Sequence, residues 1–198
     1  ECTSGFRERF GGLHLKYKIY PDIAIFGKAL GNGYAINAII GKKEIMEAAN
    51  STFISSTFWT ERIGSTAALA TLKEMETSQS WKQLINIGKK IKSNWRELRK
   101  IYALNMDING LDALPSFNFN SINNNAYKTF ITQEMLKNKI LASNVVYTSI
   151  THDKNILNKY FYNLDKIFKE ISFCENQKKN INNLLETEEC ITGFGYKK

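Results

Sequence analysis

The chain has 198 residues, of which 43% are hydrophobic, so it is long enough to bury a core of the size found in globular domains. Its net charge of +8 does not favour a nucleic-acid-binding protein, because the lysines are scattered over predicted helices instead of gathered with aromatic residues in one patch. No apolar stretch approaches the length of a membrane span, and the three cysteines, Cys2, Cys174 and Cys190, have no metal-ligand spacing and favour a reducing cytoplasm.

The stretch from Pro21 to Tyr34 leads from an apolar strand into a glycine-rich turn that contains one lysine, Lys28. Residues Ile23–Phe26 form a short apolar run of the kind that is buried on both faces in a parallel sheet. Because ligands bind at the carboxyl ends of strands in open α/β sheets, we expect Lys28 in a binding site. Desolvation beside an apolar core favours the neutral amine, which can attack a carbonyl in Schiff-base chemistry.

The glycines of this turn, Gly27, Gly31 and Gly33, permit close backbone approach and positive φ, so a flat cofactor can lie beside the lysine. The turn is not a P-loop, because Ala29 stands where a Ser or Thr would bind magnesium, and it lacks the third glycine of the dinucleotide fingerprint. A solvated loop lysine is the alternative that the spacing alone leaves open.

The elements predicted after Tyr34 are a short strand and two helices. The pattern predicts a strand over residues 35–41 and a helix over residues 43–50 with Ile45, Met46 and Ala49 facing inward. Thr57 precedes a helix predicted over residues 61–76, and a hydroxyl at this place can cap the helix or bind a phosphate. Both roles stay open for Thr57.

A polar break at residues 77–80 separates that helix from a long amphipathic one, in which apolar residues from Trp81 to Tyr102 recur at helical spacing. Strands and helices alternate after it, which predicts an α+β layer. The predicted elements of this layer are strands around residues 104–106, 116–120 and 145–147 and helices that contain Tyr127–Met135 and Ile156–Ile171.

The two histidines, His14 and His152, are not predicted to be catalytic, because the sequence places no partner beside either of them. His152 precedes a helix, where a polar residue commonly caps the helix or faces solvent. No third residue suggests a hydrolase triad or a metal site.

Three separately spaced blocks, Thr3–Arg7, Pro21–Asp22 and Gly27–Gly33, resemble in order those of the class III aminotransferases, which use pyridoxal phosphate. The resemblance includes the glutamate-1-semialdehyde aminomutase branch and runs over nearly the whole chain. It implies an α/β fold in which residues 1–80 are the C-terminal part of the large cofactor-binding domain. Residues 81–198 are then the linking helix and a small α+β domain, and the chain is expected to be the C-terminal half of an enzyme.

The resemblance also implies the roles of particular residues. Lys28 would be the Schiff-base lysine and proton carrier, with Cys2 against one face of the cofactor ring and Thr3 near its phenolic oxygen. Thr57 would bind the cofactor phosphate of the neighbouring subunit in a homodimer. The expected partners are a small amino donor and a keto or aldehyde acceptor.

Two segments differ from those of relatives. Trp59–Arg62 stands where many carry Ser-Gly-Asn-Pro, and Leu141–Ser149 is shorter than in the aminomutase branch and lacks its Pro- and Ser-rich part. The differences favour amino transfer between two molecules. A glutamate-1-semialdehyde 2,1-aminomutase and a non-catalytic binding or regulatory remnant remain as alternatives. In the tail, Gly193–Gly195 resembles a terminal block of some relatives.

Overall fold

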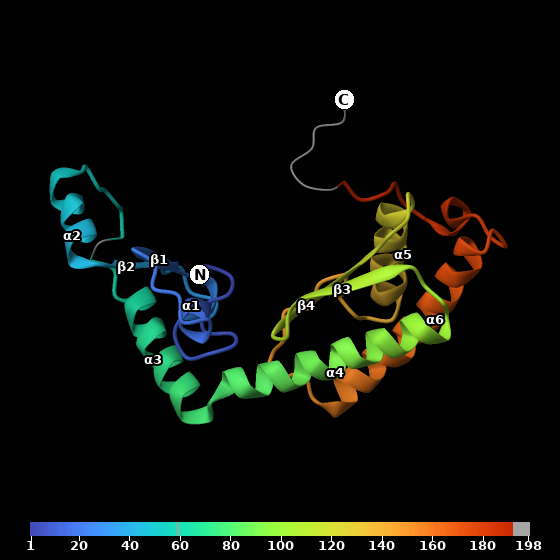
Figure 1. Ribbon diagram of the computed structural model, residues 1–198, viewed down its shortest axis with the longest axis horizontal. Coiled ribbons are helices and arrows are strands. Elements are labelled where there is room, and N and C mark those ends of the chain that lie inside the picture. Colours follow the sequence, from blue (N-terminus) through green and yellow to red (C-terminus); the bar gives the residue numbers. More distant parts are fainter. Residues whose placement is uncertain (59, 192–198) are drawn as a thin grey trace. The chain divides into compact units, whose positions relative to one another are not determined.

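The computed structural model describes residues 1–58 and 60–191, and the chain divides into two units, Glu1–Ile85 and Asn86–Lys198 (Figure 1). The division falls inside helix α4 (Ser80–Ile101), whereas the predicted domain boundary lies at the start of that helix. The assignment of these parts to a large and a small domain stays a prediction. No helix in the described ranges is long and apolar enough to cross a membrane.

The first unit contains a two-stranded antiparallel sheet of β1 (Ile23–Phe26) and β2 (Ala38–Gly41). The prediction that β1 is buried on both faces in a parallel sheet is wrong. Its second and fourth residues are buried, whereas Ile23 and Ile25 are each 44% exposed. The reason is that β1 has one packed face and, among the described residues, one neighbouring strand, so its side chains alternate between core and surface.

The helix predicted after β2 is shorter than expected and partly of another type. Helix α2 (Lys43–Met46) continues as the 3-10 helix η2 (Glu47–Ser51). The prediction that Ile45 faces inward is wrong, since this side chain is 40% exposed. The other helices of the unit are α1 (Leu13–Lys16), η1 (Lys28–Leu30) and α3 (Ile63–Ser78).

The core of this unit is small. It lies between one face of the sheet, the first residues of the chain and α3, and its buried members are Phe6, Ala24, Phe26, Leu30 and Ala68.

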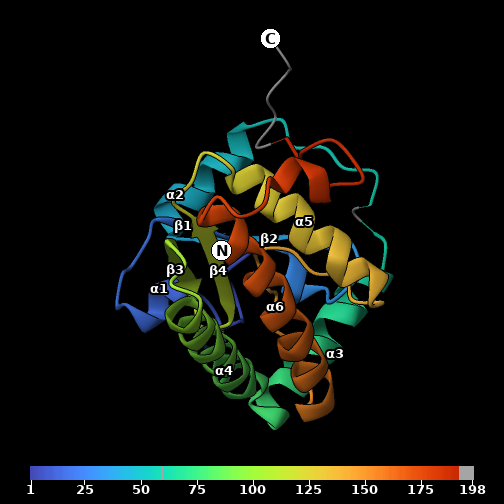
Figure 2. The same cartoon turned by 90° about the vertical axis from the view of Figure 1, so that its right-hand side faces the viewer.

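The second unit packs a β-hairpin against helices (Figure 2). Strands β3 (Met106–Leu111) and β4 (Leu114–Phe119) pair antiparallel, and α5 (Asn124–Lys137) and α6 (Lys154–Glu175) lie side by side. A 3-10 helix, η3 (Ile181–Leu184), follows. The α+β layer is therefore confirmed, while Gly193–Gly195 lies outside the described residues.

The predicted strand around Val145 is reduced to a single bridge, which pairs Val145 with Ser116 of β4. The segment nevertheless runs along the hairpin, because the Val146 N–H donates to the Pro115 carbonyl at 3.0 Å.

A large core joins the elements of the second unit. The ring of Phe117 lies edge-on to Trp95 at 4.8 Å and to Phe168 at 5.6 Å between ring centroids, and all three residues are fully buried. Two hydrogen bonds reach α6, one from Trp95 Nε1 of α4 to the Tyr160 hydroxyl at 3.1 Å and one from Tyr102, just after α4, to Asp165 at 2.8 Å. Aromatic rings and hydrogen bonds thus join α4, β4 and α6.

Candidate active site

Lys28 lies at the carboxyl end of β1, one residue after Gly27. Its ammonium Nζ donates a hydrogen bond to Thr3 Oγ1 at 2.7 Å. The expectation that the amine lies beside an apolar core is wrong, because Lys28 is exposed. The amine is held by a hydroxyl partner at the surface of the first unit, where a small molecule can reach it.

The backbone of Lys28 is strained, with φ at 43°, in the left-handed region that few non-glycine residues adopt. Positive φ was expected at the three turn glycines and is found only at Gly33, where φ is 103°. Gly31 is required for another reason, since a Cβ there would collide with the backbone oxygen of Tyr34, whereas a Cβ at Gly27 would meet only the end of the Asn37 side chain. In this turn the left-handed conformation is therefore adopted by Lys28 and Asn32 as well as by Gly33.

A carboxylate organises the turn that carries Thr3. Glu1 accepts hydrogen bonds from the Ser4 hydroxyl at 2.5 Å and from the backbone N–H of His14 at 2.9 Å, and the His14 ring lies 3.0 Å away. Burial raises the pKa of the Glu1 carboxyl, but these hydrogen bonds outweigh it and hold the pKa at about 2. Arg7 also donates to the Thr3 carbonyl at 2.7 Å.

The structure brings three of the four predicted site residues together. Cys2 is exposed, and its sulfur would lie 3.8 Å from a Cβ built on Gly27, so Cys2, Thr3 and Lys28 surround the end of β1. Thr57 lies in an exposed turn before α3, and no hydrogen bond joins it to Lys28 in the part of the chain that is described.

The start of α3 is capped by another residue. The Glu61 carboxylate accepts hydrogen bonds from the N–H groups of Ile63 and Gly64, so the capping role that was open for Thr57 belongs to Glu61. Trp59, in the segment that differs from relatives, lies outside the described residues.

Sequence reasoning missed the pairing of Glu1 with His14, for which no pattern in the sequence gives a signal. His152 also differs from expectation. Asp153 caps α6 by accepting from the Ile156 N–H at 2.8 Å, whereas His152 is half-buried and its Nδ1 accepts from the Ser149 N–H at 3.3 Å. Among the described residues, no group of three or more His, Cys, Asp or Glu residues is placed to hold a metal ion.

Comparison with known proteins identifies the family of the chain. The aminotransferase class-III family matches residues 4–155. A glutamate-1-semialdehyde 2,1-aminomutase of Saccharolobus islandicus is 28% identical over 87% of this chain and 44% of its own length. A 3-aminobutyryl-CoA aminotransferase of Cloacimonas acidaminovorans is 31% identical over 67% of this chain and 32% of its own length.

Solved structures confirm the fold class. The FumI protein of Sphingopyxis sp. MTA144, in its PLP internal aldimine form, superposes with a TM-score of 0.80 and 20% sequence identity over 93% of this chain and 45% of its own. The chain thus spans less than half the length of these relatives. With the family matched over most of its residues, the chain belongs to the class III aminotransferases.

Proposed function

We propose that this chain carries the catalytic lysine of a pyridoxal-phosphate-dependent aminotransferase, which moves an amino group to an aldehyde or keto substrate. The observation that carries the proposal is the hydrogen bond of 2.7 Å between Lys28 Nζ and Thr3 Oγ1 at the end of β1. In a class III aminotransferase, a lysine held in this way at the end of a strand is suited to covalent attachment of an aldehyde cofactor.

The residues at the end of β1 fit pyridoxal phosphate. The residue before the lysine is Gly27, which carries no side chain toward this point, and a primary amine, a hydroxyl and a thiol surround it. Lys28 would hold the cofactor covalently, and Cys2 and Thr3 would lie beside it. Thr57 would donate a hydrogen bond to the phosphate. When bound, the cofactor supplies an aldehyde carbon and an electron-withdrawing ring.

Within this mechanism, Lys28 acts as both anchor and proton carrier. Once an amino donor had freed its Nζ, Lys28 would take a proton from the donor carbon and would deliver that proton to the cofactor carbon. Thr3 accepts a hydrogen bond from that nitrogen and so keeps it near the strand end between these steps. The Glu1 carboxylate and Arg7 keep the Thr3 turn in place.

The covalent role is tested by trapping. The full-length protein is incubated with pyridoxal phosphate, reduced with borohydride and digested for mass spectrometry. We expect the pyridoxyl label on Lys28, and Lys28→Ala should remove both the label and the visible absorbance. The control Lys43→Ala, at another exposed lysine of the same unit, should keep both. Stoichiometric labelling of a different lysine would refute the proposal.

The aminomutase remains the second candidate, because relatives of that name match most of the chain. We favour transfer between two molecules because segment 141–149 differs from that branch and segment 59–62 differs from many relatives. The protein is given glutamate semialdehyde alone, and separately an amino donor with a panel of keto acids and keto sugars. Conversion of the semialdehyde to aminolevulinate, without transfer to any acceptor, would establish the aminomutase instead.

A homodimer and a cytoplasmic location belong to the same proposal. What supports the location is the odd number of widely spaced cysteines.

If Thr57 serves the neighbouring subunit, Thr57→Val should weaken cofactor binding by roughly 1.5–3 kcal/mol, the value of a hydrogen bond to a charged group. Mixing this variant with Lys28→Ala should then form hybrid dimers with one intact site. An unchanged cofactor affinity would remove Thr57 from the site.

A further inference from the structure

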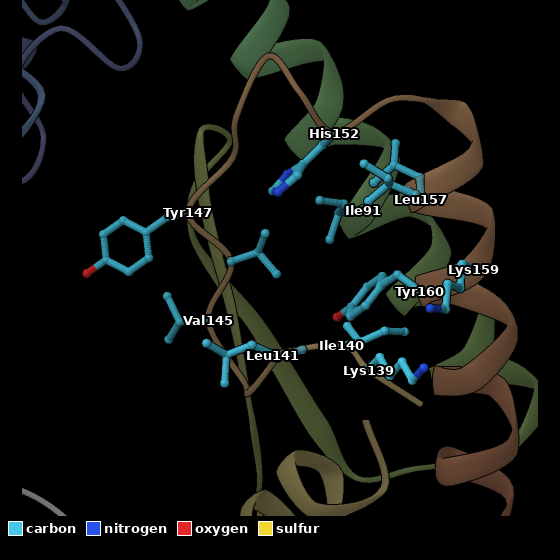
Figure 3. Close-up of a pocket in the computed structure, with 13 residues that line it drawn as sticks. Ile91, Lys139, Ile140, Leu141, Val145, Tyr147, His152, Leu157, Lys159 and Tyr160 are labelled. Atoms are coloured by element: carbon cyan, nitrogen blue, oxygen red, sulfur yellow. The ribbon is translucent and has the colours of Figure 1, made fainter. Parts of the chain in front are cut away.

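A cavity of about 440 Å³ lies in the second unit, far along the chain from Lys28 (Figure 3). It is bounded by α4, by α6 and by the segment 139–147. Its walls are mainly aliphatic, with Ile91 and Leu157 on the helices and Val146 on the segment. This volume and lining are typical of sites for small molecules, which combine apolar walls with a few polar groups.

The first such polar group is the hydroxyl of Tyr160, a residue that is only 7% exposed. Its oxygen accepts a hydrogen bond from Trp95 Nε1 at 3.1 Å and is directed toward the cavity (Figure 3). Burial raises the pKa of Tyr160, so the hydroxyl stays protonated and remains a donor. The hydrogen bonds found among the described residues include none that this hydroxyl donates, and buried donors are normally satisfied. A ligand oxygen in the cavity would accept it.

Two lysines lie on the same side of the cavity as Tyr160. Lys139 follows the end of α5, Lys159 belongs to α6, and Figure 3 shows their side chains near the Tyr160 ring. Within the ranges that the structure describes, neither lysine forms an ion pair. Two ammonium groups without carboxylate partners at one side of an apolar cavity favour an anion there.

The opposite end of the cavity is different. His152 lies there in Figure 3, and burial lowers the pKa of its imidazole, which favours the neutral form. Because its Nδ1 accepts from the Ser149 N–H, the proton of the neutral ring is on Nε2. This end therefore lacks a fixed positive charge. The cavity has one place that suits an anion, and its other walls are mainly apolar.

We propose that this cavity binds a small monocarboxylate with an aliphatic body. The carboxylate lies at Lys139, Lys159 and the Tyr160 hydroxyl, and the chain lies against Ile91 and Leu157. The site is formed by residues of the second unit alone and does not depend on the chemistry proposed for Lys28.

The first test compares three probes by isothermal titration calorimetry on the whole 198-residue chain. Hexanoate has both the anion and the apolar body, acetate lacks the body, and 1-hexanol lacks the charge. We expect hexanoate to bind with one-to-one stoichiometry and about tenfold or more tighter than either control. Hexanoate binding that is absent, or no tighter than that of acetate, would overturn the proposal.

Substitutions of the lining residues then test whether hexanoate binds in this cavity. The double variant Lys139→Gln, Lys159→Gln should weaken hexanoate binding about tenfold or more, and Tyr160→Phe roughly threefold to tenfold. Lys169→Gln, on α6 but outside the cavity, is the matched control and should bind as the native chain does. Since the lysines are exposed, their variants should fold even if Tyr160→Phe does not. Native affinity in the double lysine variant would show that hexanoate binds elsewhere.

Discussion

The two units differ in how completely each one buries its own apolar residues. The first has a core of few members, and the outer face of its sheet leaves Ile25 at 44% and Ile39 at 57% exposed. The second surrounds Phe117 with aromatic rings from two helices and a strand. The unit with the candidate active site is therefore the less self-contained one, and the unit with the separate cavity is the more rigid framework.

This difference fits the separate tasks of the units. Lys28 has a strained backbone and an exposed amine, which suit a residue that must attach to a small molecule and release it. Among the described residues of the second unit, the lysine with positive φ is Lys139, which follows the end of α5 and not a strand, and hydrogen bonds join α6 to Trp95 and Tyr102. We expect local opening of the first unit before the second.

The largest expected effect comes from the core. Phe117→Ala should lower the free energy of unfolding by about 3–5 kcal/mol, because its fully buried ring leaves a cavity between Trp95 and Phe168. Phe26→Ala, in the smaller core, should cost less, roughly 2 kcal/mol, since its surroundings can relax more easily. Urea denaturation followed by circular dichroism measures both, and equal losses would contradict the difference between the units.

A second comparison uses one helical glycine from each unit. A Cβ at Gly88 of α4 would collide with the backbone oxygen of Asp112, which cannot move without shifting the hairpin, so Gly88→Ala should cost about 1–3 kcal/mol. At Gly64 of α3 the contact is milder but still too close, 2.9 Å to the Ala35 backbone oxygen, so Gly64→Ala should also destabilise the chain, by less than Gly88→Ala. Thermal unfolding of the two variants should therefore differ, with the larger loss in Gly88→Ala.

The Glu1 carboxylate should make the first unit sensitive to acid. Its pKa in the folded chain is about 2, below the ordinary 4.5, so its stabilisation is complete above pH 4.5 and is lost as the pH falls toward 2. Glu1→Gln should remove this dependence and cost about 2 kcal/mol at neutral pH. Hydrogen exchange of the amides around Ser4 and His14 at pH 6 and pH 3 measures it. The exposed Glu44→Gln is the control, and acid-sensitive exchange that persists in Glu1→Gln would assign the effect to another group.

The smallest effect concerns a helix end in the second unit. Asp153 caps α6 through the Ile156 N–H at 2.8 Å, and Asp153→Ala should lower stability by about 1 kcal/mol. Asp153→Asn keeps an acceptor oxygen and should retain most of that stability. Calorimetric melting of the two variants tests the cap, and identical melting temperatures would mean that another group satisfies the N–H.

Much of the secondary structure was predictable because it depends on local patterns. Apolar residues at helical spacing indicated α4 and α6, and Phe117 and Phe119 indicated β4 by alternation. The strand around Val145 was overpredicted, because a short apolar run does not reveal how many ladder bonds the segment will make. Ile45 was misplaced because a helix of four residues has too little periodicity to define an inner face.

The sequence by itself determined the position of Lys28 after an apolar strand, the need for glycine around it and the order of the family blocks. These are properties of neighbouring residues, and the chain carries them in any conformation. Only the tertiary structure decided that β1 pairs antiparallel, that Lys28 adopts positive φ and that Thr3 is its partner from 25 residues away. The reason is that hydrophobic pattern specifies which face of an element is buried, whereas the groups that meet across space depend on how all the elements pack together.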